Sequence, residues 1–382
     1  MTTALKKILI LTTVGPDKKE HGNYQDIYDR IGIFKDLGLE IQVAYFHRNG
    51  SNTESSEDIK VLPIDTTDRR LFKFDGALGL DSSVQVEEMI KVVKNYQPHF
   101  VFAEYFYFSK LITQLKPLFP DIQFCIRCHN FEYQHLREKF ALKKSSSLRE
   151  RLVRWYNLIR CHNYEKAMAA SADLIFCISK YDADLYSRQF VGNNHFLYLP
   201  ASMVYQPIYQ VAEHSPLNVL YLGSDFSNSY NLEGAQWVVK IAKQVDSEKL
   251  KFHICGKNLP ETIVSETSIK YHGFVHELEA LLVNMDFAIL PNYHGYGMKV
   301  KAYELFQRRF PVIITDRIHQ SFKGTSGETY LVADSLPDWV DNCYKLQDPD
   351  LRARLSKNIS TFMTQNFNQE RVVNILKDSL NL

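Results

Sequence analysis

Short apolar runs alternate with longer amphipathic stretches along most of the chain. Residues 6–14, 39–46 and 99–106 are nearly continuous apolar runs, which is typical of strands that helices cover on both faces. Amphipathic stretches at 24–37 and 82–95 predict helices between them. Further strands are predicted at 59–65, 123–130, 172–179 and 193–201, with a helix over 109–118. Because strands that alternate with helices form parallel sheets with right-handed crossovers, the pattern predicts an α/β fold.

The alternation starts again after residues 202–216, a connector that holds two prolines. Strands are predicted at 218–224, 251–257 and 269–275, and helices at 231–245 and 276–284. Each half has a glycine-bearing turn after its first strand, so we predict two Rossmann-like domains with a ligand crevice between the carboxyl ends of their strands. The predicted parts are an N-terminal domain at 1–204, a C-terminal domain at 205–365, and a helix at 366–382 that packs back on the N-terminal domain.

Residues 286–316 carry the clearest chemical pattern. Two apolar strands, Asp286 to Leu290 and Pro311 to Thr315, flank a loop and a helix with the spelling Gly-x-Gly-x-Lys-x-Lys-x-x-Glu. The members of this pattern are Gly295, Gly297, Lys299, Lys301 and Glu304. Glycines let the backbone approach a ligand, and the N–H groups of a helix start favour an anion. The pattern therefore predicts a site for phosphate and hydroxyl groups, and a glycine loop with solvated lysines is the alternative that it leaves open.

A basic segment, residues 137–166, interrupts the alternation. It holds nine Lys or Arg and three Glu residues, a net charge of +6 in a chain of net charge +1. One side of a helical projection holds Leu148, Leu152, Trp155, Tyr156 and Ile159, and the rest holds Arg149, Arg151, Arg154 and Arg160. A basic amphipathic helix is typical of a membrane-surface contact. The alternative, which we favour, is a helix that packs its apolar face inward and keeps its arginines in water.

Composition narrows the class of protein. The 382 residues exceed one ordinary domain, and 45% hydrophobic, 23% charged residues and a mean hydropathy of −0.26 describe a soluble globular chain. A net charge of +1 argues against a general nucleic-acid coat. The N-terminal apolar run predicts a first strand and not a signal peptide, and the scattered cysteines suit a cytoplasm. Cys125 to His129 has the haem-attachment spelling, but the run also completes an alternating strand.

The order of these motifs resembles GT-B glycosyltransferases, and most of all the retaining, nucleotide-sugar-dependent family 4, also called glycosyl transferases group 1. The resemblance covers nearly the whole chain and is most specific in the second half. It rests there on VLYLGSDFSNSYNLEGAQ, HICGK, YHGFVHELEALLVNMDFAILPNYHGYGMKVKAYE and PVIITD. In the first half it rests on CHNFEY and on SADLIFCISKYDADL. It implies the GT-B architecture, in which two Rossmann-like domains face each other across a cleft.

The resemblance also implies roles for individual residues. Lys299 and Lys301 match the positions that hold the donor diphosphate, and Glu304 matches the glutamate expected on the ribose hydroxyls. His129 matches the histidine that faces the donor sugar. The implied catalytic residues are His129, Lys301 and Glu304. The implied donor-binding residues are Gly22, Asn130, Gly223, Ser224, Gly295, Gly297, Met298, Lys299 and Val300.

This chain departs from the family pattern at two places. Many members carry a glutamate eight positions before the helix glutamate, and here that position is Tyr296. This puts in doubt what contacts the donor sugar from the C-terminal domain. The loop after the first strand also lacks a Gly-Gly pair, which weakens the assignment of Gly22.

The expected activity is retaining, metal-independent transfer of a hexose from a nucleotide-diphosphate-sugar to a hydroxyl of a glycan or lipid-linked acceptor. No resident cofactor or metal is expected, because two lysines and a helix start can stabilise the leaving diphosphate. The Asp182-Ala-Asp184 spelling is assigned to the start of a helix. We expect a cytoplasmic protein with no nucleic-acid partner, and a contact of 137–166 with the inner membrane face is the alternative that the basic segment leaves open.

Three other functions stay open. A sugar-nucleotide 2-epimerase shares the two-domain architecture, and it would isomerise its substrate without an acceptor. A nucleotide-sugar-binding scaffold or partner subunit would bind the donor without turnover. A dinucleotide dehydrogenase is weaker, because GPDKKEHG lacks the G-x-G-x-x-G spacing after the first strand.

Overall fold

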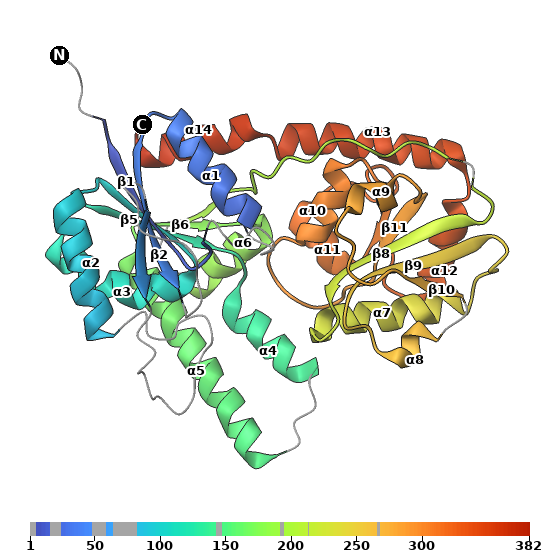
Figure 1. Ribbon diagram of the computed structural model, residues 1–382, viewed down its shortest axis with the longest axis horizontal. Helices are drawn as coiled ribbons and strands as arrows, with labels where there is room; N and C mark the ends of the chain where they lie inside the picture. Colours follow the sequence, from blue (N-terminus) through green and yellow to red (C-terminus); the bar gives the residue numbers. More distant parts are fainter. Residues whose placement is uncertain are drawn as a thin grey trace. The chain divides into compact units, whose positions relative to one another are not determined.

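A computed structural model describes residues 5–15, 24–47, 59–63, 82–142, 147–191, 195–212, 214–265 and 268–382. The chain divides into two compact units (Figure 1). Unit 1 comprises Met1–Phe140, Lys144–Met203 and Gln369–Leu382, and unit 2 comprises Ala141–Lys143 and Val204–Asn368. The last fourteen residues therefore belong to the unit that begins the chain.

Unit 1 is built on a seven-stranded parallel sheet with the strand order β3-β2-β1-β4-β5-β6-β7. Its strands are β1 (Lys7–Thr12), β2 (Glu40–His47), β3 (Ile59–Pro63), β4 (Phe100–Glu104), β5 (Gln123–Cys128), β6 (Leu174–Cys177) and β7 (Phe196–Tyr198). The central strand β1 is flanked by β2 and β4, and its residues Ile8 to Leu11 are completely buried. This explains its continuous apolar sequence, because helices cover both faces of the sheet.

Helices pack around this sheet in unit 1 (Figure 1). They are α1 (Tyr24–Asp36), α2 (Ser83–Tyr96), α3 (Ser109–Leu115), α4 (Glu132–Leu142), α5 (Leu148–Ser171), α6 (Lys180–Gln189) and α14 (Gln369–Leu380), with short 3-10 helices at Phe106–Phe108 and Lys116–Leu118. Helix α3 packs against both α2 and α5. Helix α14 buries Val372, Leu376 and Leu380, and Lys6 Nζ donates to the carbonyl of Asn381 at 2.8 Å. Both ends of the chain are thereby joined within unit 1.

Unit 2 has a six-stranded parallel sheet with the order β10-β9-β8-β11-β12-β13. Its strands are β8 (Leu217–Asp225), β9 (Leu250–Lys257), β10 (Ile269–Tyr271), β11 (Phe287–Leu290), β12 (Val312–Ile314) and β13 (Leu331–Val332). Its helices are α7 (Ser229–Ala242), α8 (Glu261–Val264), α9 (Leu278–Leu282), α10 (Val300–Gln307), α11 (Asp316–Phe322), α12 (Leu336–Lys345) and α13 (Pro349–Asn366). The predicted α/β fold with two Rossmann-like parallel sheets is confirmed.

In each unit the strand order reverses direction next to the first strand, between β1 and β4 in unit 1 and between β8 and β11 in unit 2. The loops that leave two such neighbouring strands diverge to opposite faces of the sheet and leave a crevice at the carboxyl ends. The carboxyl ends of β8 and β11 lead to Ser224 and to the glycine loop at 291–299. The fold therefore brings together two segments that lie about seventy residues apart in the sequence.

Two expectations from the sequence need correction. The strand predicted at 269–275 ends at Tyr271, because Gly273 has a φ of +67° and turns the backbone out of the extended conformation. The basic segment at 137–166 forms two helices, with α5 beginning after the N-cap Ser147, whose hydroxyl accepts from the Glu150 N–H at 3.2 Å.

The inward packing that we favoured for the apolar face of the basic segment is also wrong. Leu148, Leu152, Trp155 and Ile159 are 71%, 54%, 62% and 38% exposed. By contrast Arg160 is buried, and Arg154 contacts Glu150 and the carbonyl of Phe140. Helix α5 turns polar groups inward here because the neighbouring helix α4 offers a carbonyl and an aromatic ring to Arg154.

Candidate functional site

The loop between β11 and α10 is shaped by its two glycines. Gly295 and Gly297 have φ values of +93° and +80°, which residues with a Cβ rarely adopt. The hydroxyl of Ser321 donates to the carbonyl of Gly297 at 3.1 Å and fixes the second turn. Met298 is buried, and Lys299 is the N-cap of α10 in an extended conformation, so that Val300 opens the helix. The first N–H groups of α10 consequently end this loop, as an anion site requires.

Lys301 lies on the first turn of α10 and keeps part of its surface accessible. Its Nζ donates to Oδ1 of Asn231 on α7 at 2.8 Å. Burial lowers the pKa of Lys301 to about 7. The charge of Glu304 opposes this change, and the charge of Lys299 adds to it. An anion placed beside this amino group would restore its charge, because the ammonium form would gain a partner of opposite sign.

Lys299 and the glycine loop are tied to α7 by a second chain of contacts. The Nζ of Lys299 donates to the carbonyl of His294 at 3.1 Å, and Nδ1 of His294 lies 2.8 Å from Oε2 of Glu233. The side-chain amide of Asn292 donates to the carbonyl of Tyr230 at 3.1 Å. Helix α7 therefore contacts the loop at Asn292 and at His294.

Glu304 lies one turn after Lys301 and faces Arg308. Its Oε1 is 3.1 Å from Nη1 of Arg308, whose Nη2 donates to Glu279 at 2.6 Å. Burial raises the pKa of Glu304, and the charge of Arg308 opposes this. A carboxylate held in this way has a fixed orientation, which suits the predicted role as an acceptor for hydroxyl groups.

Gly223 and Ser224 end strand β8 beside this loop. A Cβ on Gly223 would come within 2.3 Å of the Phe226 ring and 2.8 Å of the carbonyl of Cys255. The glycine is thus required by the packing of its own unit. Ser224 is exposed, and its Oγ accepts a hydrogen bond from Asn231 Nδ2 at 3.2 Å. Asn231 was not among the predicted site residues, although it follows the β8 loop in a region that the resemblance covers.

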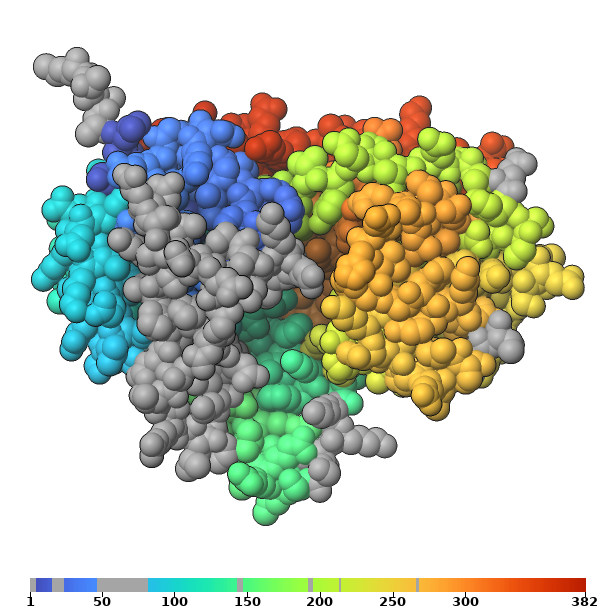
Figure 2. Space-filling model, viewed as in Figure 1, coloured from blue at the N-terminus to red at the C-terminus, as the bar shows by residue number. Residues whose placement is uncertain are grey.

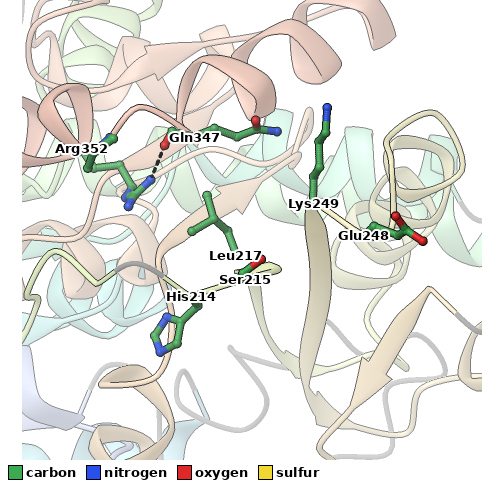
Figure 3. Close-up of a pocket in the computed structure, with 8 residues that line it drawn as sticks. His214, Ser215, Leu217, Glu248, Lys249, Gln347 and Arg352 are labelled. Atoms are coloured by element: carbon green, nitrogen blue, oxygen red, sulfur yellow. Dashed lines mark hydrogen bonds between the residues drawn. The ribbon is translucent and has the colours of Figure 1, made fainter.

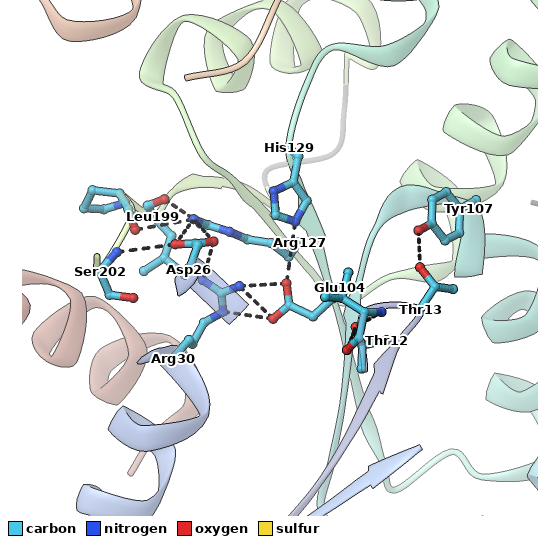
Figure 4. A network of polar contacts seen from close by, with 12 residues as sticks. Thr12, Thr13, Asp26, Arg30, Glu104, Tyr107, Arg127, His129, Leu199 and Ser202 are labelled. Carbon is cyan, nitrogen blue, oxygen red and sulfur yellow. Dashed lines mark hydrogen bonds and ion pairs between the residues drawn. The ribbon is translucent and has the colours of Figure 1, made fainter. Parts of the chain in front are cut away.

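In unit 1 the predicted residues His129 and Asn130 follow β5, and Gly22 lies outside the described residues. His129 is only 6% exposed, and its Nε2 lies 3.6 Å from Oε2 of Glu104 (Figure 4). Burial lowers the pKa of His129, although the charge of Glu104 opposes this change. The lowered pKa keeps the ring neutral near pH 7. The side chain of Asn130 donates to Glu132 at 2.9 Å.

His129 borders a buried network of four charged groups (Figure 4). Arg30 bonds both oxygens of Glu104 at 2.7 Å and Asp26 at 3.0 Å, and Arg127 reaches Asp26 at 3.3 Å. Burial alone would raise the pKa values of the two acids, but the arginines hold both below their ordinary range. Two positive and two negative charges balance, so the network can remain ionised inside the unit.

Tyr105 is strained and lies directly beside His129. It follows β4 with a φ of +146°, its ring centroid is 4.7 Å from that of His129, and it stacks on Tyr107 at 4.9 Å. Tyr107 in turn bonds Thr13, which follows β1, at 2.8 Å. Backbone strain of this kind collects at functional sites. The carboxyl ends of β1, β4 and β5 thus meet in one cluster of aromatic side chains and a histidine. The sequence motifs indicated His129 but not its aromatic neighbours.

A cavity of about 330 Å³ lies at the opposite end of the unit 2 strands from the glycine loop, near the amino ends of β8 and β9 (Figure 3). Its wall includes His214, Lys249 and Arg352. Arg352 donates to the carbonyls of Leu346, Gln347 and Ala212, so its guanidinium serves the backbone. Parallel sheets bind ligands at the carboxyl ends of their strands, which places this cavity away from the expected site.

The described residues offer neither a metal centre nor a membrane-spanning helix. No group of three or more His, Cys, Asp or Glu side chains there is arranged to hold a metal ion, and metal independence stays a prediction. None of the helices that the structure describes is both long and apolar enough to span a membrane. The Asp182 carboxylate of α6 bonds the N-cap hydroxyl of Ser179 at 2.7 Å, which gives it a structural role.

Comparison with known proteins supports this description. Residues 216–348 match the model of the family described as Glycosyl transferases group 1. Comparison with curated proteins gave no match. Sucrose-phosphate synthase from Thermosynechococcus elongatus is similar in structure, with a TM-score of 0.73, 17% sequence identity and 98% of each chain covered.

Two further solved structures contain ligands. HepE from Anabaena, in complex with UDP and glucose, has a TM-score of 0.67 at 12% identity, with 98% of this chain and 99% of HepE covered. A TarM variant from S. aureus, in complex with Fondaparinux, alpha-GlcNAc-glycerol and UDP, has a TM-score of 0.66 at 10% identity, with 99% and 100% covered. The chain has the GT-B fold of glycosyltransferases. The match to the Glycosyl transferases group 1 model lies within its second unit.

Proposed function

We propose that this protein transfers a hexose from a nucleotide-diphosphate-sugar to a hydroxyl of a glycan or lipid-linked glycan, with retention of the anomeric configuration and without a metal. The observation that carries the proposal is the meeting of Lys301, Ser224 and the glycine loop at the carboxyl ends of β8 and β11. The similar HepE and TarM structures contain UDP, which supports a nucleotide diphosphate as the ligand of this site.

The chemistry follows from where charge develops. As the bond between sugar and phosphate breaks, the diphosphate gains negative charge, and an ammonium group and the start of a helix stabilise it. In this proposal Lys301 and Lys299 bind the diphosphate, and the N–H groups that begin α10 bind its terminal phosphate. Glu304, held by Arg308 at 3.1 Å, accepts the ribose hydroxyls. The resemblance assigns His129 to the donor sugar, and the protein needs no resident cofactor.

A binding and turnover experiment tests the proposal. A thermal-shift screen without metal uses UDP-glucose, GDP-mannose and ADP-glucose, and a ligand present at 100 times its Kd adds about 2.7 kcal/mol of stability. Lys301→Ala should abolish the shift and lower kcat/KM on the bound donor by about 10²–10³-fold. Lys251→Ala, which removes an exposed lysine from β9, is the control.

The outcomes separate the candidate functions. A shift that Lys301→Ala leaves intact would contradict the assignment of the site. Binding without transfer to any glycan, tested with radiolabelled donor, would favour a nucleotide-sugar-binding scaffold. Release of an isomerised sugar nucleotide without acceptor would favour an epimerase. Proton NMR of the product decides between retention and inversion.

We further propose that unit 1 contacts an acidic membrane surface through α5. Leu148, Leu152, Trp155 and Ile159 follow each other at spacings of four, three and four residues and form one exposed apolar row. They lie on α5, which Figure 1 labels, and atoms of this helix are visible in green at the surface in Figure 2. Exposed Arg149 and Arg151 lie on either side of this row on the helix. An apolar row that arginines flank matches a bilayer interface, where apolar groups enter and each arginine contributes about 1 kcal/mol with anionic lipid.

Vesicle sedimentation tests this contact. The wild-type protein should bind vesicles of phosphatidylcholine with 30% phosphatidylglycerol, and Leu152→Ser with Trp155→Ser should lower the partition coefficient at least about tenfold. Leu118→Ser, at another exposed position of unit 1, is the control. No binding by the wild-type protein would contradict the contact. A wild-type dimer that the double variant loses would assign the row to self-association.

A further inference from the structure

Asn231 occupies a central position between the two segments of the donor site. It is the third residue of α7, and only 9% of it is exposed. Its Oδ1 accepts from Lys301 Nζ at 2.8 Å, while its Nδ2 donates to the carbonyl of Asp225 at 2.8 Å and to Ser224 Oγ at 3.2 Å. One amide therefore connects the ammonium on α10 with the hydroxyl and backbone at the end of β8.

The backbone of Asn231 is fixed as firmly as its side chain. Its carbonyl accepts from the hydroxyl of Tyr221, a completely buried residue of β8, at 2.9 Å. The next turn of α7 approaches β8 so closely that a Cβ on Gly234 would lie 2.1 Å from that same hydroxyl. The position of the Asn231 amide is thus set by the packing of α7 on β8, and Lys301 adopts the direction that this amide offers.

We propose that Asn231 is a positioning residue that holds the Lys301 ammonium and the Ser224 hydroxyl side by side for the diphosphate of the donor, and that it thereby couples donor binding to uptake of a proton by Lys301. The inference rests on the proposed function, because it assigns the donor diphosphate to this site.

A neutral amide is the side chain that this role requires. Its oxygen accepts from Lys301, but it carries no charge that would compete with the diphosphate. Glu304 and Lys299 are the charged groups that act on Lys301 from its own helix and N-cap. On α7 the neighbouring acid, Glu233, is paired with His294 of the glycine loop. Without an anion, burial therefore decides the charge of Lys301, and its pKa of about 7 leaves it partly neutral at neutral pH.

The consequence is a donor affinity that depends on pH. The diester diphosphate of a sugar nucleotide does not titrate between pH 6 and pH 9, so the change in affinity reports the protein. Above the pKa of Lys301 the protein must take up a proton when it binds the donor, and the Kd should rise about tenfold for each pH unit. A Kd measured at pH 6, 7, 8 and 9 therefore has an alkaline limb that starts near pH 7.

Two substitutions at position 231 should move this limb in opposite directions. Asn231→Asp places a carboxylate beside Lys301, which raises the pKa of the ammonium, so the limb should move up by about one pH unit or more. Binding at pH 6 should nevertheless weaken, because the carboxylate competes with the diphosphate. Asn231→Leu removes the acceptor and should move the limb down. Both variants lose the hydrogen bonds that the amide nitrogen donates to Ser224 and Asp225. If Asn231 had only a structural role, both variants would change the pH dependence of the Kd in the same way.

The experiment uses the full chain. The ligand is whichever of UDP-glucose, GDP-mannose and ADP-glucose the wild-type protein binds. The Kd is measured by calorimetry in two buffers of different ionisation enthalpy. The number of protons taken up is read from the difference between the buffers. Gln236→Glu places the same negative charge on the exposed side of α7 and should leave the limb unchanged. Thermal unfolding of each variant without donor shows whether the variant is folded. If Asn231→Leu does not fold, Asn231→Ser replaces it.

Opposite displacements of the limb for Asp and for Leu or Ser, with proton uptake by the wild-type protein at pH 8, support the proposal. A wild-type protein that binds a donor with the same alkaline limb as both variants would overturn the role of Asn231 and leave the proposed function intact. A wild-type protein that binds none of the three sugar nucleotides would overturn the proposed function together with this inference.

Discussion

One side chain outside the donor site, the carboxyl of Glu165 on α5, is buried without a cationic partner among its hydrogen bonds to the described residues. It is completely buried, and its Oε1 accepts from the hydroxyl of Tyr186 at 2.7 Å and from the Tyr133 N–H at 3.0 Å. Its Oε2 has no hydrogen-bond partner among the described residues. Burial raises the pKa of Glu165 to about 7, against these hydrogen bonds and with a contribution from Asp182. The raised pKa makes this site most stable when the carboxyl is protonated.

Glu165→Gln should therefore stabilise unit 1 above neutral pH. A carboxyl whose pKa rises on folding stabilises the folded state below its unfolded pKa near 4.5, and this contribution is lost as the pH rises toward 7. At about 1.36 kcal/mol per pH unit, the variant should gain up to about 3 kcal/mol relative to wild type at pH 8 and almost nothing at pH 4.5. Thermal midpoints across this range measure the effect. Asp184→Asn, at an exposed position of α6, is the control, and equal gains at both pH values would contradict the argument.

At the scale of elements, α7 is the helix on which the donor site depends. It supports the glycine loop through Glu233 and the carbonyl of Tyr230, and it holds Lys301 through Asn231. Its close approach to β8 is possible because residue 234 is a glycine, since a Cβ there would lie 2.1 Å from Tyr221 Oη. Tyr221 cannot move aside easily, because it is completely buried and donates to the Asn231 carbonyl.

Gly234→Ala should accordingly destabilise unit 2 by about 1–3 kcal/mol and weaken donor binding, because the helix must shift away from β8. Gly32→Ala is a matched control within the first helix of unit 1. Gly32 also lies inside a helix, but nothing approaches its added Cβ within 4 Å. That variant should be neutral or more stable by up to about 1 kcal/mol. Chemical denaturation, monitored by hydrogen exchange in each unit, measures the stability of both variants. Equal effects of the two substitutions would contradict the packing argument.

At the scale of the whole molecule, chain order and spatial unit do not coincide at the C-terminus. Residues Gln369–Leu382 belong to unit 1, although unit 2 precedes them in the sequence. Leu376 is completely buried there, whereas Lys377 next to it is exposed. The stability of the first unit therefore depends on the last residues of the chain.

Leu376→Ala should destabilise unit 1 by about 2–5 kcal/mol, through loss of buried apolar surface and formation of a cavity. Hydrogen exchange followed by mass spectrometry should show faster exchange in β1, β4 and β5 and unchanged exchange in β8, β9 and β11. Lys377→Ala should change neither set of strands. Faster exchange confined to the unit 2 strands would contradict the assignment of α14 to unit 1.

Much of this architecture was determined by the sequence alone. The runs Ile8 to Leu11 and Phe287–Leu290 are apolar throughout because strands buried on both faces have no polar side. The glycines at 295 and 297 predicted a loop between a strand and a helix, and the loop is found there, with both glycines at positive φ. The parallel α/β fold followed from such local signals, because each depends on residues close together in the chain. The GT-B class followed from the resemblance of the ordered motifs to a known family.

The tertiary structure decided what distant residues do to each other. Asn231 faces Lys301 only because the sheet order places β8 beside β11, and periodicity contains no information on that pairing. His129 was predicted from a motif, but its burial beside Glu104 and the strained Tyr105 arises where β4 and β5 end together. The apolar row of α5 has the same helical period whether it faces protein or solvent, so only the packed chain shows that it is exposed. Local patterns determine the elements, and the sheet order and packing determine the contacts between them.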